Sequence, residues 1–476
     1  MRDRHGRRGG ASRARQLAGL LLAFALLASH ARADGSDPGE GVARAVEDPA
    51  ARLQKTVLDN GLILLTLEDH GTPVVSFQAW VKVGSADETR FTGLAHLFEH
   101  MMFKGSRNLA EERHARLIEA RGGRVNAFTS RDVTVYFEDV TSDTLPLVIE
   151  LEAERFANLE ISEATLKSER EVVIEERRMR IEDNPNGRAF EALAALVWRS
   201  NTYRRPVIGW REDLEQVTVA ACREFFDTFY AANNVVLVIV GDFDSEQTIA
   251  HVRRAFGGLR RAAEIPRVPF RKPAQRGERR EVVEFQVQSS ILLAAWHAPA
   301  TGHPDAEALD VASQILSAGR SSRLYRALVH EAEIAIYADG GYWELQKAGL
   351  FFASAAARPG SSIAEVEELF LSEIERIRDE GVTQEEVAKA KRQLEVALVN
   401  GLATTHALAS RIARETVSFG RVRSLQERLD ATQAVTPDDV QRVMQRYLRP
   451  DQLTVVHVVP PPTPSQPAAG PDSSGG

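Results

Sequence analysis

The sequence is poor in cysteine and lacks the signatures of several common enzyme classes. Of its 476 residues only Cys222 is a cysteine, so no intramolecular disulfide can form. There is no G-x-S-x-G nucleophile motif, no Walker phosphate loop and no G-x-G-x-x-G dinucleotide fingerprint. The sequence therefore excludes a disulfide framework and gives no support to a serine hydrolase, a P-loop NTPase or a dinucleotide-binding enzyme.

The N-terminal apolar run is too short to span a membrane. It covers residues 17–28, whereas a transmembrane helix needs about 20 apolar residues. Seven arginines surround this run, and Ala31-Arg32-Ala33 offers small residues for signal-peptidase cleavage before Asp34. We therefore predict a cleaved signal peptide rather than an uncleaved anchor, with export to the periplasm as the first choice and secretion as the second.

The charge balance is acidic. The whole chain has a net charge of −8, and without residues 1–33 it keeps 52 Lys and Arg against 66 Asp and Glu. A net charge of −14 argues against nucleic acid or an anionic membrane surface as a partner. The remaining length predicts two or three domains with ample cores.

Residues 93–106, GLAHLFEHMMFKGS, carry the strongest chemical signal. His96, Glu99 and His100 form H-x-x-E-H, the inverted zinc-peptidase motif. On a helix, residues four apart share a face, so the two histidines can bind one metal ion while Glu99 takes a proton from water. Chance decoration of an amphipathic helix remains the alternative until a third ligand is found.

The third ligand is expected in residues 163–182, a charged helical run with Ser162 as a plausible N-cap. Glu169 and Glu176 are seven apart and therefore share a face. From the residues alone, most glutamates in such a run are solvated surface charges, and any one of them has about one chance in ten of being a ligand. The run also has an expected apolar stripe, formed by Leu166, Val172, Val173 and Met179.

The two segments together resemble the pitrilysin/insulinase family of inverted-zincin metallopeptidases, in its half-length type, which includes the mitochondrial processing peptidase. The resemblance rests on GLAHLFEHMMFKGS and on SEREVVIEERRM about 75 residues later. It implies one Zn²⁺ per chain, held by His96, His100 and Glu176. It also implies that Glu169 supports the site without binding the metal. Glu175 is the fallback ligand if the register is wrong by one residue.

Residues 124–140 alternate like strands around a turn. Within them, Asn126, Ala127 and Phe128 match the family's N-A-[FY]-T segment. The resemblance implies an edge strand beside the zinc, to which an extended peptide substrate adds as a further strand. An ordinary core hairpin is the alternative. For Phe128 we give the substrate-binding strand and the core hairpin equal weight.

The second half of the chain repeats the first. The strand around Phe77–Trp80 recurs 216 residues later at Leu293–Trp296, and a helix and strand recur with an offset of 218. Similar offsets at distant places indicate tandem duplication. The 216 shift places the metal motif over Ala312, Ile315 and Leu316, so we expect the only zinc site in the first half.

The resemblance implies an α/β (α+β) fold of two homologous domains. Each should be a mostly antiparallel sheet covered by helices, and the two should face each other like a clam shell. The predicted boundaries are a signal peptide at 1–33, a flexible leader at 34–50, an N-terminal catalytic zinc domain at 51–262, a linker at 263–281, a C-terminal inactive homologous domain at 282–459 and a disordered tail at 460–476.

One feature of the family is missing. After G-x-S-S-R-L, here residues 319–324, members often carry an arginine and a tyrosine seven apart that hold the substrate carbonyl. Depending on register, this chain has Val329 and Ile336, or His330 and Tyr337, and neither pair keeps the arginine. Its loss would remove electrostatic stabilisation of the transition state. We therefore predict a heterodimer whose homologous partner subunit supplies the pair, with a homodimer possible.

These observations predict a zinc metalloendopeptidase that hydrolyses peptides or unfolded segments in an enclosed chamber. Glu99 would take a proton from water and pass it to the leaving amine. Two non-catalytic roles are the alternatives, a scaffold subunit of the same fold and a periplasmic peptide-binding protein.

Overall fold

The computed structural model describes residues 48–271 and 275–462. The predicted signal peptide therefore lies outside the described residues, as do most of the predicted leader and most of the predicted tail. The described residues belong to a compact unit that begins at Asp48. Within these two ranges, none of the helices combines the length and the apolar character that a bilayer span requires.

The first half forms a six-stranded sheet with the order β1-β2-β6-β3-β5-β4. Its only parallel pair is β2 with β6, and its other neighbours are antiparallel. The strands are β1 (Gln54–Val57), β2 (Ile63–Glu68), β3 (Val74–Val81), β4 (Arg124–Thr129), β5 (Thr134–Thr141) and β6 (Val235–Gly241).

The second half forms a five-stranded sheet with the order β7-β11-β8-β10-β9, again with one parallel pair, β7 with β11. The strands are β7 (Arg279–Glu284), β8 (Ile291–Ala298), β9 (Ala335–Trp343), β10 (Gly349–Ala357) and β11 (Thr454–Val459). Strand for strand this order repeats β2-β6-β3-β5-β4. The predicted fold class, two mostly antiparallel sheets covered by helices, is confirmed.

The helices also follow the duplication, since α8 (Val219–Phe229) recurs 218 residues later as α15 (Pro437–Tyr447). The remaining helices of the first half are α1 (Pro49–Arg52), α2 (Leu94–Met101), α3 (Arg113–Glu119), α4 (Leu145–Asn158), α5 (Glu163–Arg177), α6 (Pro185–Val197), α7 (Arg211–Gln216) and α9 (Ser245–Phe256). Those of the second half are α10 (Ala306–Ser317), α11 (Ile363–Glu380), α12 (Gln384–Asn400), α13 (Thr405–Phe419) and α14 (Leu425–Ala434).

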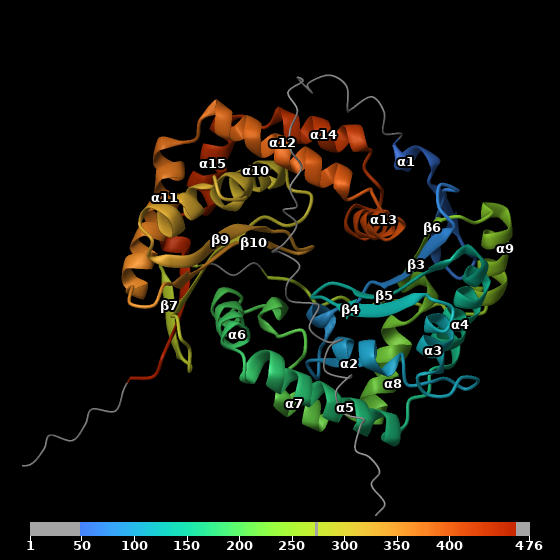
Figure 1. The fold of residues 1–476 in the computed structure, drawn as a ribbon. Coiled ribbons are helices and arrows are strands. Elements are labelled where there is room, and N and C mark those ends of the chain that lie inside the picture. Colours follow the sequence, from blue (N-terminus) through green and yellow to red (C-terminus); the bar gives the residue numbers. More distant parts are fainter. Residues whose placement is uncertain (1–47, 272–274, 463–476) are drawn as a thin grey trace, which may run out of the picture. The chain divides into compact units, whose positions relative to one another are not determined.

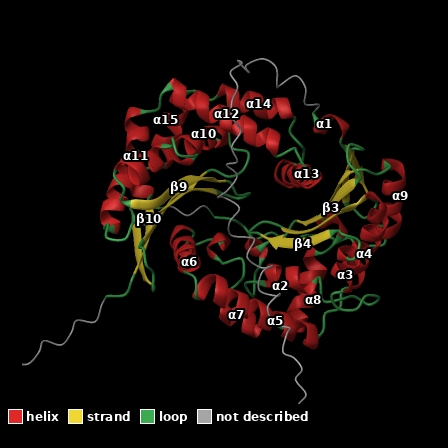
Figure 2. Ribbon diagram, in the orientation of Figure 1, coloured by secondary structure: helices red, strands yellow, loops and turns green. Residues whose placement is uncertain are grey.

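Each half lends one helix to the sheet of the other (Figure 1). One face of the first sheet packs against helices of its own half, including α2, α4 and α8. The opposite face packs against α13, through Leu408 and Ile412. In return, α6 covers one face of the second sheet through Leu193 and Val197. Figure 2 shows the same layering of helices on strands. The exchange ties the two halves together through apolar side chains.

Two predicted segment ends differ from the structure. The last residues of the predicted leader already form α1, whose N-cap Asp48 also accepts a hydrogen bond from the Leu425 backbone N–H at 2.9 Å. The predicted linker 263–281 overlaps β7, because Arg279 begins the parallel pairing with β11.

Candidate metal centre

Helix α2 carries the H-x-x-E-H motif and begins at a tightly packed glycine. Gly93 has φ +88°, and a Cβ there would lie 2.6 Å from the Ile208 carbonyl oxygen. Both features demand glycine. The buried Glu88 carboxylate accepts hydrogen bonds from the backbone N–H groups of Gly93 and Ala95, each at 2.9 Å. An acidic group at a helix N-terminus satisfies free N–H donors there and so fixes the start of the helix.

Helix α5 carries Glu176, the residue predicted as the third ligand. Ser162 caps it, accepting a hydrogen bond from the Thr165 N–H at 3.2 Å, as predicted. The predicted apolar stripe is half wrong, because Leu166 and Val173 are buried whereas Val172 and Met179 are 47% and 53% exposed. Adjacent helical residues point about 100° apart, so Val172 cannot share the buried face of Val173.

The structure brings His96, His100 and Glu176 together, with one potential ligand atom from each lying within 4.8 Å of the others. His100 Nε2 is 3.1 Å from Glu176 Oε2, and His96 Nε2 is 3.7 Å from Glu176 Oε1. Ligand atoms about 2.05 Å from a zinc ion at tetrahedral corners would be about 3.3 Å apart. Two imidazoles and one carboxylate are also a donor set that zinc favours. The three residues therefore fit a zinc ion.

His96 and Glu176 are held in the protonation states that bind metal, whereas His100 is not. Burial opposes the charging of His100, but hydrogen bonds to Glu169 and Glu176 raise its pKa to about 9, so this imidazole would release a proton on binding a metal. Burial, reinforced by His100, lowers the pKa of His96 to about 3, so this imidazole is neutral. Burial opposes ionisation of Glu176, but the hydrogen bond to His100 and nearby positive charge lower its pKa to about 2. A neutral imidazole and an ionised carboxylate are the forms that bind metal.

Glu169 lies beside His100, at the ring nitrogen that does not face Glu176. Its Oε2 is 3.5 Å from His100 Nδ1, while Oε1 is 2.8 Å from Lys104 Nζ. The His100 ring therefore faces Glu169 with Nδ1 and Glu176 with Nε2. A carboxylate on the far nitrogen of a metal-binding histidine typically fixes its tautomer and orientation.

Glu175 lies away from the cluster. Its side chain is 54% exposed and pairs with Arg178, with 2.6 Å between Glu175 Oε1 and Arg178 Nη2. The neighbouring basic residue Arg180 places Nη1 2.6 Å from Glu176 Oε1. Sequence reasoning missed Arg180, since an arginine in a charged run resembles any surface residue.

Glu99 lies one turn after His96 and accepts a hydrogen bond from the Thr129 hydroxyl, with 2.7 Å between Thr129 Oγ1 and Glu99 Oε2. Burial raises the pKa of Glu99, and the bond from Thr129 opposes that rise. Sequence reasoning missed Thr129, although it follows Phe128 directly and completes the N-A-F-T segment.

Asn126, Ala127 and Phe128 lie on β4, which within residues 48–271 and 275–462 is an edge strand paired only with β5. The Asn126 side chain accepts a hydrogen bond from the Ala127 N–H at 2.9 Å. The Phe128 ring packs edge-to-face on Trp80, with centroids 5.9 Å apart. The strand thus leaves one backbone edge open, while the Phe128 side chain packs within the domain.

A second buried group of ionisable residues joins His114, Glu138, Glu152 and Arg155. Its His114, Glu138 and Glu152 ligand atoms are also close enough for a shared metal ion. However, the Arg155 guanidinium is paired with both Glu138 and Glu152 and lies over the rings of Phe103 and Tyr136. Arg155 therefore already supplies the positive charge, and we assign this cluster to stability.

The second half offers no counterpart of the motif. Ala312, Ile315 and Leu316 lie on α10, and all three are buried in the apolar core. Within the described residues, both groups that could share a metal ion lie in the first half.

The positions of the missing Arg–Tyr pair lie just before and at the start of β9, the edge strand of the second sheet. Val329 packs against the apolar core, whereas Ile336 on β9 is 52% exposed. His330 lies in a π-helical turn, η6 (Tyr325–Glu331), and Tyr337 lies on β9. The structure thus keeps a tyrosine near the expected place without an arginine in either register.

The fold and this cluster define a two-domain protein whose first half brings together two histidines and a glutamate that fit a zinc ion. The family model "Insulinase (Peptidase family M16)" matches residues 63–210, and "Peptidase M16 inactive domain" matches residues 216–394. The chain belongs to this insulinase, or M16, peptidase family.

Relatives and solved structures agree with this assignment. An uncharacterised zinc protease of Streptomyces coelicolor is 29% identical, over 85% of this chain and 89% of the relative. Zinc protease PqqE of Helicobacter pylori is 28% identical, over 86% and 93%. The mitochondrial-processing peptidase subunit beta of Lentinula edodes is 25% identical, over 83% and 87%. The crystal structure of a Helicobacter pylori protease matches with a TM-score of 0.83 and 27% identity, over 86% of this chain and 99% of that one.

Proposed function

We propose that this chain is a zinc metalloendopeptidase that hydrolyses peptides or unfolded segments. The observation that carries the proposal is the convergence of His96, His100 and Glu176, with Glu99 beside them. The names of its relatives as zinc proteases support it. These three residues would hold the metal, and Glu169 would keep His100 oriented.

When bound, zinc would supply Lewis acidity that polarises a peptide carbonyl and acidifies water. The Glu99 carboxylate would take a proton from the attacking water and deliver it to the amine that leaves as the peptide bond breaks. The open edge of β4 would hold the substrate as an added strand, mainly through backbone hydrogen bonds at Asn126–Phe128. Backbone recognition makes few demands on substrate sequence and favours extended, unfolded segments.

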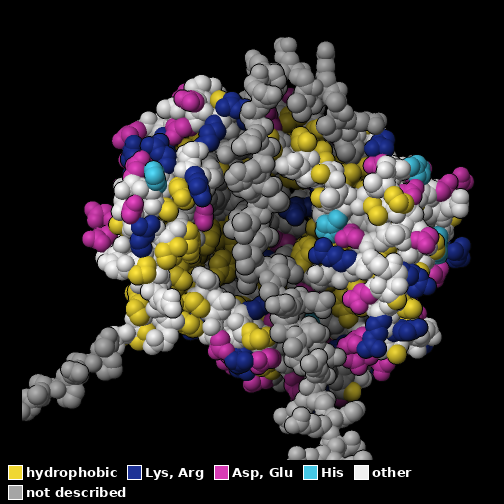
Figure 3. Space-filling model, in the orientation of Figure 1, with side chains coloured by type: hydrophobic (Ala, Val, Ile, Leu, Met, Phe, Trp, Pro, Cys, Tyr) yellow, Lys and Arg dark blue, Asp and Glu magenta, His cyan; other side chains and the backbone are white. Residues whose placement is uncertain are grey.

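We also propose export to the periplasm and a homologous partner subunit. The first rests on the sequence of residues 1–33. The second rests on the missing arginine, and one relative is itself named as a subunit. On the face shown in Figure 3, acidic and basic side chains are interspersed, which suits peptide partners better than nucleic acid.

Peptide hydrolysis by the purified chain tests these proposals. The chain would be assayed with zinc, with a chelator, and mixed with candidate homologous subunits. Zinc-dependent cleavage that rises at least about tenfold in a mixture would support both the peptidase and the shared site. Activity that no homologue raises would refute the partner. Bound zinc without cleavage in any mixture would refute the peptidase and favour a scaffold or peptide-binding role.

A further inference from the structure

Thr129 is the contact that holds the proposed proton-transfer group. Its hydroxyl donates to Glu99 Oε2 at 2.7 Å. Thr129 is the last residue of β4 and pairs with Thr134 of β5. Because a side chain at a strand end moves with the turn that follows it, the position of Glu99 depends on the turn at residues 130–133.

Hydrogen bonds inside the turn, and others from a neighbouring segment of the first half, hold this turn in place. Ser130 Oγ accepts hydrogen bonds from the backbone N–H groups of Asp132 at 3.2 Å and Val133 at 3.1 Å. From outside, the Ser85 N–H donates to the Ser130 carbonyl at 3.2 Å, and the Ala86 N–H to the Arg131 carbonyl at 2.9 Å. The turn has little freedom as long as these bonds persist.

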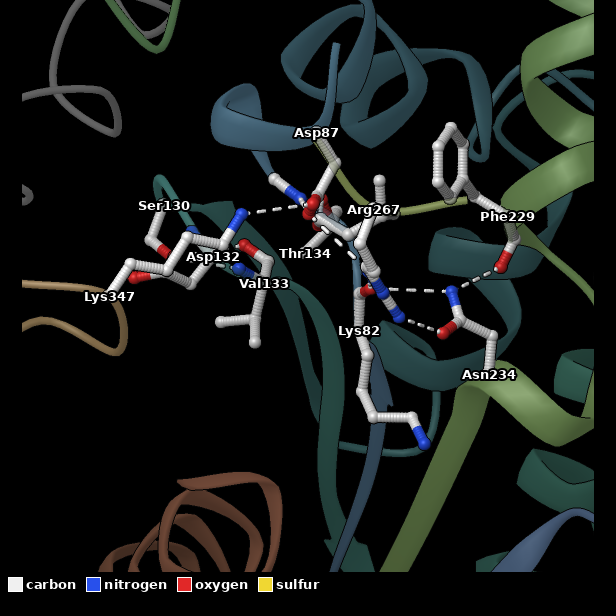
Figure 4. Close-up of polar contacts among 12 residues, drawn as sticks. Lys82, Asp87, Ser130, Asp132, Val133, Thr134, Phe229, Asn234, Arg267 and Lys347 are labelled. Carbon is white, nitrogen blue, oxygen red and sulfur yellow. Dashed lines mark hydrogen bonds and ion pairs between the residues drawn. The ribbon is translucent and has the colours of Figure 1, made fainter. Parts of the chain in front are cut away.

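The second half also contacts the turn, through the segment that connects β9 and β10. The Gln346 N–H donates to Asp132 Oδ2 in the turn at 3.2 Å. Lys347 Nζ donates at 3.1 Å to Asp87 Oδ1, in the Ser85–Asp87 segment whose N–H groups bond to the turn. The Lys347 N–H donates to the Tyr203 hydroxyl at 3.0 Å, and that hydroxyl donates to Asp132. Figure 4 shows Lys347 beside Asp132 and Asp87.

These contacts are shielded from water, which strengthens them. Asp87 is 3% exposed and Asp132 is 8% exposed. Lys347 and Arg267 are the cations that face Asp87, with Arg267 Nη1 3.4 Å from Asp87 Oδ2. Removing the Lys347 ammonium would leave the buried Asp87 carboxylate with Arg267 as its remaining cation, so the Ser85–Asp87 segment, and with it the turn, should loosen.

We infer that Lys347 and its connection position Glu99 through the turn and Thr129, so the half without metal ligands contributes to the chemical step. Thr129 and Lys347 are positioning residues in this inference, which rests on the proposed function. Glu99 would then exchange its proton at Oε1, since Oε2 is held by Thr129.

Kinetics of matched variants test the inference. Thr129→Val keeps the shape but removes the hydroxyl, and should lower kcat about 10- to 100-fold with KM and zinc content unchanged. Thr129→Ser keeps the hydroxyl and should retain most activity. Lys347→Met should lower kcat about 2- to 10-fold, and the double variant should match Thr129→Val alone, because both act on one route. A Thr129→Val variant with wild-type kcat would overturn the inference. So would a double variant whose fold loss in kcat equals the product of the two single losses.

Hydrogen–deuterium exchange on the metal-free protein provides a readout that needs no activity. Lys347→Met should speed exchange at residues 130–133 several-fold, whereas the control Lys389→Met should not. Lys389 is a lysine of the same half that contacts Ser321 instead of the turn. An unchanged exchange rate at residues 130–133 in Lys347→Met would show that the second half does not stabilise the turn. The expected exchange change in a zinc-loaded wild type that stays inactive in every mixture with homologous subunits would instead refute the proposed function.

Discussion

Glu176 and Glu175 are adjacent glutamates that the structure places in opposite environments, which makes them a matched pair for mutation. Glu176 is 12% exposed and lies 3.1 Å from His100 Nε2, whereas Glu175 is 54% exposed and pairs with Arg178. Substituting a residue that only supports metal ligands typically costs about 10- to 100-fold in affinity. Glu176→Gln removes a ligand itself, so its zinc affinity should fall more than about 100-fold, or about 2.8 kcal/mol.

The assay is a competition titration of zinc against a chromogenic chelator, with zinc content measured after dialysis. Glu175→Gln should bind zinc within about twofold of wild type, because an exposed ion pair contributes about 0–1 kcal/mol to stability and touches no ligand here. Circular dichroism would confirm that both variants are folded. Normal zinc binding by Glu176→Gln together with lost zinc binding by Glu175→Gln would show that Glu175, not Glu176, is the ligand. Normal zinc binding by both variants would show that neither glutamate of α5 is a ligand.

Three further changes test other parts of the structure. Arg155→Met should destabilise the fold by about 3–5 kcal/mol in chemical denaturation, against about 0–1 for the exposed control Arg116→Met. The Arg155→Met deficit should be larger at pH 8 than at pH 5.5, because buried carboxylates with raised folded-state pKa values lose stability as the pH rises; a pH-independent deficit would argue against the buried charges. Burial opposes the ionisation of Glu367, but hydrogen bonds to His457 and an arginine lower its pKa to about 2. Its stabilisation, up to about 3 kcal/mol, should be present above pH 4.5 and lost as the pH falls toward 2, and Glu367→Gln should flatten that acid limb of the unfolding curve. Glu169→Gln should weaken zinc binding about 10- to 100-fold, and an unchanged affinity would show that His100 needs no such partner.

Much of the fold could be predicted because the chain repeats itself. The offset of 218 residues placed α15 from α8, and the 216 shift put Ala312 on α10 as the partner of His96. The H-x-x-E-H spacing placed both histidines on one face of α2, since helical geometry is local. The proposed third ligand is far from the motif in the sequence, and only the family resemblance selects Glu176 from a run of glutamates.

The rest depended on tertiary contacts that leave no local pattern. The sequence does not predict that α6 packs on the second sheet and α13 on the first. Each helix is amphipathic, and its apolar face would look the same whichever sheet it covered. The apolar pattern predicts a buried Val172, whereas the helix turns this side chain toward solvent. Thr129 and Lys347 are ordinary polar residues until the fold brings them to the site.

The most direct test of the central claim is single-turnover peptide hydrolysis by the Glu99→Gln variant loaded with zinc. The substitution keeps the size of the side chain and an oxygen that can accept from Thr129, but it removes the group that carries the proton. We predict a bound zinc ion, unchanged peptide binding and a rate at least about 10²-fold below wild type. A variant that cleaves at the wild-type rate with zinc bound would show that Glu99 does not transfer the proton.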